Sequence, residues 1–173
     1  MEKSMRFWFC LFLSGLYVMI AGCGYHFAGG QNFPFQIKTI FVPVFENKTS
    51  ETGIETITTN AFIYELVRSS HVRVVKKDLA DAVLSGTIRS LSTHTISRSS
   101  VKSPLERRVI MVVDLELTNR QGQVLWASRK FSGYESYAVQ SDKLFTEARK
   151  QQAIRTISEK MAERVYYQLV DMY

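Results

Sequence analysis

The sequence predicts an α+β fold of two layers, in which a mixed four-stranded sheet packs two helices on one of its faces. Two observations lead to this prediction. The spacing of the apolar residues changes between a period of two and one of about 3.6, which gives the order strand, helix, strand, strand, strand, helix. Each helix carries a single apolar stripe that needs cover, and one sheet face can cover both.

The first half of the chain supplies one strand and one helix. Residues 37–45 are mostly β-branched and aromatic, which predicts a strand; because Pro43 lacks an amide donor, this strand should lie at a sheet edge or break near its end. Polar residues 46–50 predict a turn with residues suited to cap a helix. Residues 51–70 predict an amphipathic helix, whose stripe is Ile54, Ile57, Ala61 and Tyr64, widened by Leu66 and Val67.

Three further strands are expected in the middle of the chain. After extended residues 72–75, a long strand begins near Ala82 and presents an apolar face of Ala82, Leu84, Gly86 and Ile88. The Ser- and Thr-rich residues 92–106 predict a loop. The next strand alternates polar residues with Val109, Met111, Val113, Leu115 and Leu117. A turn at 119–122 then leads to the returning strand, expected at 124–134.

The order of the elements also predicts the topology. A right-handed crossover through the first helix should pair the first two strands in parallel, and the two tight links should add antiparallel neighbours. The last helix is expected to run from a cap at Ser141 and Asp142 to about Val170. Its stripe is Ile154, Ile157, Met161, Val165 and Leu169. Residues 37–173 are therefore expected to form one domain.

Residues 1–22 have the layout of a secretory signal peptide. Lys3 and Arg6 precede an apolar run at 7–20, which is too short to remain in a membrane as a spanning helix. Small residues then lead into Cys23, as in the bacterial lipobox. This pattern predicts cleavage before Cys23 and a membrane anchor of acyl chains on that residue. The alternative is an unmodified cysteine after an ordinary signal peptide. Gly24, in place of Asp, predicts transfer to the outer membrane, and residues 23–36 are expected to form a tether.

Charge and cysteine content limit the partners. The chain has a net charge of +6, which in a cytoplasmic protein would favour nucleic acid, but an exported lipoprotein does not meet nucleic acid. The anionic partners to expect are lipid head groups, lipopolysaccharide phosphates or an acidic protein surface. Cys10 leaves with the signal peptide, so Cys23 is the only cysteine of the mature chain and no internal disulfide can form.

The sequence contains no motif that predicts catalysis. It has no nucleophile elbow, phosphate-binding loop, dinucleotide-binding turn or zinc-protease helix. His26, His71 and His94 are scattered and lack the close spacing that metal ligands require. We therefore expect no enzyme, no metal site and no cofactor other than the covalent lipid on Cys23.

A basic cluster surrounds the Ser-rich loop. Arg98, Lys102, Arg107 and Arg108 should meet at one end of the sheet, because the loop joins two antiparallel strands. Arg and Lys side chains there suit phosphate recognition, since charge-assisted hydrogen bonds to phosphate oxygens are stronger than neutral ones. The alternative is a solubilising loop whose charges contact only water.

Several segments resemble the LptE family of outer-membrane lipoproteins of lipopolysaccharide assembly. The most specific is Cys-Gly-Tyr-His-Phe at 23–27. The others are Ile-Phe-Val-Pro-Val-Phe-Glu-Asn-Lys-Thr at 40–49, Gly-Ile-Glu at 53–55, Ala-Asp-Ala-Val-Leu-Ser-Gly-Thr-Ile at 80–88 and Gly-Gln-Val-Leu-Trp at 122–126. They follow the family order over most of the mature chain.

The resemblance implies a protein that works by contact. LptE proteins sit as a plug inside the β-barrel of LptD, assist its assembly and bind lipopolysaccharide on its way to the outer leaflet. Basic side chains near one end of the LptE sheet are linked to lipid A recognition. By this resemblance the basic loop, together with Lys143 near the start of the last helix, is the candidate phosphate-binding site.

Two other functions remain open at this point. The chain could be an accessory lipoprotein of a secretion pore or a phospholipid-transport complex, whose domains share the strand-helix-strand plan and which would have no lipopolysaccharide ligand. A lipoprotein hydrolase is the second alternative, and the absence of a paired nucleophile and base argues against it.

Overall fold

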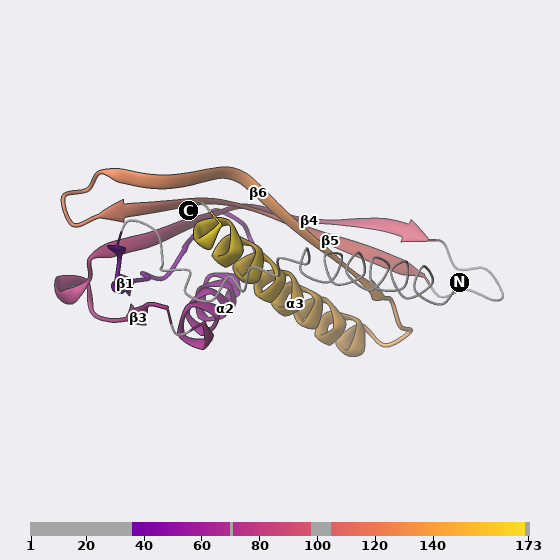
Figure 1. The fold of residues 1–173 in the computed structure, drawn as a ribbon. Coiled ribbons are helices and arrows are strands. Elements are labelled where there is room, and N and C mark those ends of the chain that lie inside the picture. Colours follow the sequence, from indigo (N-terminus) through magenta and orange to yellow (C-terminus); the bar gives the residue numbers. More distant parts are fainter. Residues whose placement is uncertain (1–35, 70, 98–104, 172–173) are drawn as a thin grey trace, which may run out of the picture. The chain divides into compact units, whose positions relative to one another are not determined.

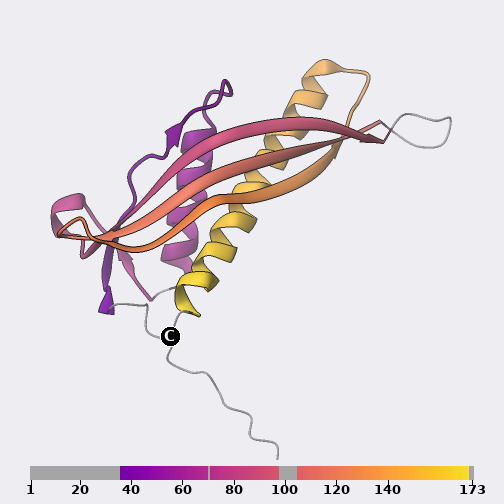
Figure 2. The same ribbon diagram turned by 90° about the horizontal axis from the view of Figure 1, so that it is seen from above.

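The computed structural model describes residues 36–69, 71–97 and 105–171, and residues Asn32–Tyr173 form one compact unit. Within it, a sheet forms one layer and the two α-helices form the other, on a single face of the sheet (Figures 1 and 2). The predicted α+β class is confirmed. The elements are β1 (Thr39–Phe41), β2 (Glu46–Asn47), α2 (Ile54–Arg68), β3 (Arg73–Val74), the 3₁₀ turn η2 (Lys77–Leu79), β4 (Ala82–Ser97), β5 (Glu106–Asn119), β6 (Val124–Ala138) and α3 (Lys143–Val170).

The sheet is mixed, as expected, but it has six strands in the described residues. Its order is β3-β1-β4-β5-β6, and β2 pairs separately with β4. Strand β1 is parallel to β3 and β4, which confirms the predicted parallel pairing, and β4, β5 and β6 are antiparallel neighbours, as the two tight links predicted. The predicted count of four strands was wrong. The extra strands, β2 and β3, have two residues each and are too short to show a period in the sequence.

Pro43 breaks the first strand instead of placing it at an edge. Strand β1 ends at Phe41, two residues before the proline, and lies between β3 and β4. Pairing with β4 resumes at Glu46 in β2. The break lets the Phe45 ring lie over Gly86 of β4, where an added Cβ would come within 2.5 Å of the ring. Gly86 is therefore required by a close approach within the core.

Helix α2 is shorter than predicted, and its buried face is shifted from the predicted stripe: Ile54 and Leu66 are buried and Ile57 and Ala61 pack against the core, but two predicted members are exposed. Gly53, with φ 88°, precedes the helix, and residues 46–50 do not cap it; Asn47 and Thr49 bond each other in the preceding loop, and Asn47 also donates to the Glu55 side chain in the first turn. Tyr64 and Val67, both predicted in the stripe, are 66% and 56% exposed. The buried side chains of the helix are Ile54, Thr58, Thr59, Phe62, Glu65 and Leu66. The buried face is turned because Phe62 packs on Phe45 and Thr58 packs against Ser158 of α3.

Strands β4 and β5 extend further than the sequence suggested. Residues 92–97, expected in a loop, continue β4 and pair with the start of β5 as far as Ser97 and Glu106. β-Branched Thr93, Thr95 and Ile96 suit an extended backbone, so the polar composition alone was a poor guide. Strand β6 likewise continues to Ala138. Residues 98–104 lie outside the described residues.

The core lies between the sheet and the two helices. The predicted faces of β4 and β5 and the predicted stripe of α3 are confirmed: Ala82, Leu84, Ile88, Val109, Met111, Val113, Leu115, Leu117, Ile154, Ile157, Met161, Val165 and Leu169 are all buried. The α3 cap is also confirmed, since the Leu144 amide donates to Asp142 Oδ1 (2.7 Å). Helix α3 crosses close over β6 at Gly133, where an added Cβ would lie 2.8 Å from Met161.

Asp81 joins the first strand to the long hairpin. Its Oδ2 accepts hydrogen bonds from the Thr39 hydroxyl (2.7 Å) and from the amides of Thr39 (3.0 Å) and Lys38 (3.2 Å). The Thr39 hydroxyl chiefly, then these amides and the Arg120 guanidinium, hold the pKa of Asp81 below its usual value. The charged carboxylate therefore stabilises the fold above the unfolded pKa, and this stabilisation is lost as pH falls through the folded pKa.

We predict that Asp81→Ala lowers the free energy of unfolding at neutral pH by about 1–2 kcal/mol, a value reduced for the partial exposure of the carboxylate. The deficit should shrink below about pH 4, as the wild-type carboxylate becomes protonated. Urea unfolding followed by circular dichroism measures both effects. Asp78→Ala is the matched control, since Asp78 is exposed. A deficit that is the same at pH 3 and pH 7 would contradict this role.

Candidate functional site

Three of the predicted site residues lie in the described part of the chain. They are Arg107 and Arg108, at the start of β5, and Lys143, the first residue of α3. Cys23, Arg98 and Lys102 lie outside the described residues. The start of α3 and the β4–β5 hairpin end lie toward the same end of the sheet in both views (Figures 1 and 2). The fold therefore brings the three described cations to one end.

The two arginines point to opposite faces of the sheet. Successive side chains of a strand alternate, and Arg107 shares its face with Val109 and Met111, which are buried under the helices. Arg108 lies on the other face, which no described helix covers and which we call the open face (Figure 2). Lys143 belongs to the helix layer. Positive charge is thus divided between both sides of the same sheet end.

Arg108 is paired with a ring and not with a carboxylate. Its guanidinium lies 4.8 Å from the centre of the Tyr134 ring, and no ion pair to Arg108 exists among the described residues. The Tyr134 side chain is 64% exposed. A cation–π contact orients the guanidinium without neutralising it, so its charge is available to an anion on the open face.

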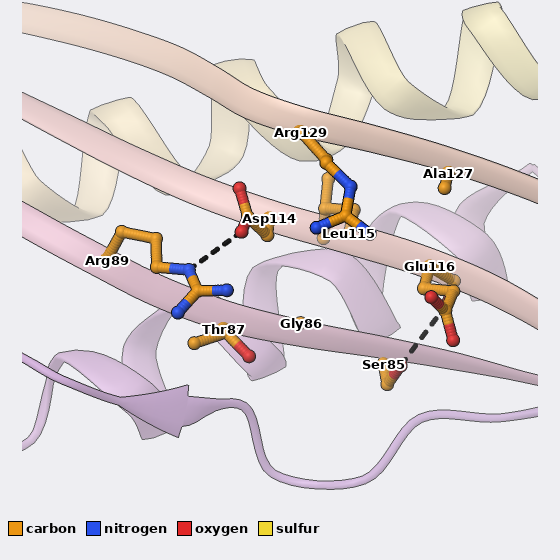
Figure 3. A pocket seen from close by; sticks show the side chains of 9 residues that line it. All are labelled: Ser85, Gly86, Thr87, Arg89, Asp114, Leu115, Glu116, Ala127 and Arg129. Atoms are coloured by element: carbon orange, nitrogen blue, oxygen red, sulfur yellow. Dashed lines mark hydrogen bonds and ion pairs between the residues drawn. The ribbon is translucent and has the colours of Figure 1, made fainter.

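A shallow hollow lies further along the open face (Figure 3). It has a volume of about 210 Å³ and includes polar side chains from β4, β5 and β6: Ser85, Thr87, Arg89, Asp114, Glu116 and Arg129. Arg89 Nε donates to Asp114 Oδ2 (2.7 Å). The helices lie behind the sheet in this view, so the hollow is separated from the core by the strands.

Asp114 holds a bulge in the edge strand. Its Oδ1 accepts a hydrogen bond from the Lys130 amide (2.8 Å), and the β5–β6 register shifts between Val113 and Leu115. Lys130 has φ 56°, in the left-handed region that non-glycine residues seldom adopt. The Lys130 amide first, and then the Arg89 side chain, lower the pKa of Asp114. Asp114 therefore stays charged and fixes the strand geometry around Arg129.

The described residues contain no cluster of metal ligands. No group of three or more His, Cys, Asp or Glu residues within them could hold a metal ion. His71 lies beside the Tyr166 hydroxyl and His94 beside the Ser92 hydroxyl, and neither of these two described histidines lines the hollow. Of the helices in the described ranges, none is long and apolar enough to span a membrane.

Comparison with known families decides the identity of the domain. Residues 37–169, which contain every strand and nearly all of the last helix, match the model of the family LptE, described as lipopolysaccharide-assembly. The chain belongs to the LptE family. LptE proteins are accessory lipoproteins without a cofactor or an enzymatic role, and the resemblance noted in the sequence is confirmed. No curated protein is similar enough to the chain to count as a match.

Solved structures share the fold of this LptE domain at low identity. A protein from Caulobacter crescentus CB15 is 13% identical, with a TM-score of 0.53, and the match covers 75% of this chain and 89% of that one. Lipoprotein B from Nitrosomonas europaea is 11% identical, with a TM-score of 0.52 and coverage of 86% and 92%. The hypothetical protein CT253 from Chlamydia trachomatis is 10% identical, with a TM-score of 0.52 and coverage of 79% and 99%. These similarities establish a common architecture.

The LptE-like segments at 40–49, 53–55 and 80–88 supply contacts that hold the fold together, and the segment at 23–27 lies outside the described residues. Asn47 donates to the Glu51 carbonyl (2.7 Å) and to Glu55 (2.8 Å), and Glu51 in turn accepts a bond from Lys150 of α3 (2.6 Å). Asp81 joins β1 to β4, and Gly86 makes room for a core ring. The sequence did not indicate Arg89 or Lys130. Their contacts with Asp114 join three strands, so they can be recognised only when the register of β4, β5 and β6 is known.

We predict that Asp114→Ala opens the β6 bulge locally. The Lys130 amide loses its acceptor, so its hydrogen exchange should become faster by on the order of tenfold, the equivalent of one hydrogen bond. Amide exchange followed by NMR measures this. Glu116→Ala is the control, because Glu116 shares the open face and its side chain does not bond the bulge. Unchanged exchange at Lys130 in the Asp114 variant would show that the bulge does not depend on this carboxylate.

Proposed function

We propose that this LptE-family chain is an outer-membrane lipoprotein that works as the plug of an LptD-like barrel. Acyl chains on Cys23 anchor it on the periplasmic side of the membrane. The domain assists assembly of the barrel and binds lipopolysaccharide during delivery to the outer leaflet. It carries out no reaction of its own.

The observation that carries this proposal is the family match over residues 37–169, which spans nearly the whole described domain. The contact chemistry supports it. A small domain of this kind can fill the lumen of a barrel. The polar side chains on the open face of its sheet are then available to a ligand. The cations at one end of the sheet suit the phosphates of lipid A, because guanidinium and ammonium groups form charge-assisted hydrogen bonds with phosphate oxygens.

The second candidate is an accessory lipoprotein of a secretion or phospholipid-transport complex. The shared fold with solved proteins at 10–13% identity is the observation that favours it, since this architecture is not restricted to one sequence family. The two candidates differ in their ligand. Only the first requires lipopolysaccharide binding.

We predict that replacing Arg98, Lys102, Arg107 and Arg108 together with Ala weakens lipopolysaccharide binding at least about tenfold and makes the remaining binding less sensitive to salt. Retention of the purified protein on immobilised lipopolysaccharide, across a range of salt concentrations, measures both effects. The matched control replaces four other exposed cations, Lys38, Arg73, Lys76 and Lys77, which lie around β1 and β3 at the other end of the sheet. An equal loss of lipopolysaccharide binding in both variants would show that binding depends on net charge and not on this site.

We also predict that Cys23→Ala abolishes acylation. The thiol that receives the lipid is missing, so labelled palmitate should no longer be incorporated, and the chain should leave the outer membrane or retain its signal peptide. Metabolic labelling followed by membrane fractionation measures this. Cys10→Ala is the control, because Cys10 lies in the expected signal peptide and its variant should be labelled normally. Labelling of the Cys23 variant would refute the anchor.

A further inference from the structure

The first turn of α3 exposes two large apolar side chains in succession. Leu144 is 81% exposed and Phe145 is 61% exposed. Single exposed apolar residues are common on protein surfaces and need no explanation. Most of the others in this chain stand alone, such as Val44, Leu79 and Val124. An adjacent Leu and Phe at the start of a helix form an apolar tip that nothing in the described residues covers.

The apolar tip is held in one geometry by its own turn. Asp142 Oδ1 accepts a hydrogen bond from the Leu144 amide (2.7 Å). The Thr146 hydroxyl lies 3.0 Å from the Gln140 amide, from which it accepts, and 3.1 Å from the carbonyls of Gln140 and Asp142. The link from β6 into α3 is therefore closed by hydrogen bonds at both ends. Leu144 and Phe145 are therefore exposed at the start of a capped helix.

Cations lie on the helix side of this sheet end, near the apolar tip, together with the acidic Asp142 and Glu147 of the same helix start. Lys143 directly precedes Leu144, and Arg149 follows within two turns; both are exposed. Arg107 lies on the same side of the sheet, paired in register with Tyr137 near the end of β6. Within the described residues none of these three cations has a carboxylate within ion-pair distance. Ile96, 42% exposed, adds an apolar side chain near the end of β4.

An occupant of this surface must combine an apolar part with negative charge. An anionic lipid meets both requirements, because its acyl chains can cover Leu144 and Phe145 while its phosphates meet Lys143 and Arg107. A soluble anion would leave the apolar pair in water. A purely apolar partner would leave Lys143, Arg149 and Arg107 without a direct ion-pair contact.

We infer that Leu144 and Phe145 form an acyl-chain contact for the phosphorylated lipid that the neighbouring cations bind. This assignment rests on the proposed function, in which that lipid is lipopolysaccharide. It divides recognition between two groups of residues: the cations contact the phosphates, and the apolar tip contacts the fatty acyl chains. Removal of the tip should then weaken binding only when the ligand carries its acyl chains.

The test uses the full acylated protein in detergent and two immobilised probes, intact lipopolysaccharide and alkali-deacylated lipopolysaccharide, which retains its phosphates. The double variant Leu144→Ser/Phe145→Ser should bind intact lipopolysaccharide on the order of tenfold more weakly than wild type, and should bind the deacylated form equally well. Because both side chains are exposed, the variant should fold normally, which circular dichroism checks.

The matched control is Tyr64→Ser/Val67→Ser, a second exposed apolar pair, which lies on α2. It should bind both probes like wild type. Wild-type binding by the tip variant, an equal loss on both probes, or an equal loss in the control would each overturn the acyl-chain assignment. If wild type itself binds neither probe, the proposed function fails as well, an outcome distinct from failure of the tip alone.

Discussion

The alternation of side chains along strand β5 determines what lies on each side of the sheet. Its odd-numbered residues from Val109 to Leu117 are buried against α2 and α3, and its even-numbered residues, among them Arg108 and Asp114, stand on the open face. A shift of one residue would expose the core and bury the charges, so the register is strongly specified. Strand β5 also has a full-length neighbour on both sides, so the positions of β4 and β6 depend on it.

In this arrangement, the residues that stabilise the fold and the residues exposed to a partner lie on different parts of the sheet. The helix-covered face supplies the buried apolar area, and the polar bonds of Asp81 and Asn47 join the early elements to the hairpin and to α3 through Glu51. The open face and the sheet end carry the groups that can meet a partner: Arg108 on the Tyr134 ring, the hollow around Asp114, and the start of α3 with Lys143. These surfaces provide the contacts that an accessory lipoprotein of the LptE family requires.

Much of the fold could be predicted because its signals are local. Residues close together in the sequence determine the alternation in β5, the turn at Gly122, the Asp142 cap and the α3 stripe. Apart from the parallel pairing of β1 with β4, features that depend on distant partners could not be predicted. Strands β2 and β3 exist only through pairing with β4 and β1, and the buried face of α2 is set by Phe45 and Ser158. At the site, the common end of Arg107 and Arg108 followed from the hairpin. Their opposite faces follow from the same alternation, whereas the Arg89–Asp114–Lys130 contacts need the bulged register of three strands.

The central claim is that this LptE-family domain performs its work inside a complex and not as a free protein. The most direct measurement is isolation of the tagged full chain from cell envelopes in mild detergent, followed by identification of the proteins that remain bound and of their stoichiometry. We expect a stable one-to-one complex with a large outer-membrane barrel protein. Recovery of the chain alone, or with the subunits of a secretion or phospholipid-transport complex, would contradict it.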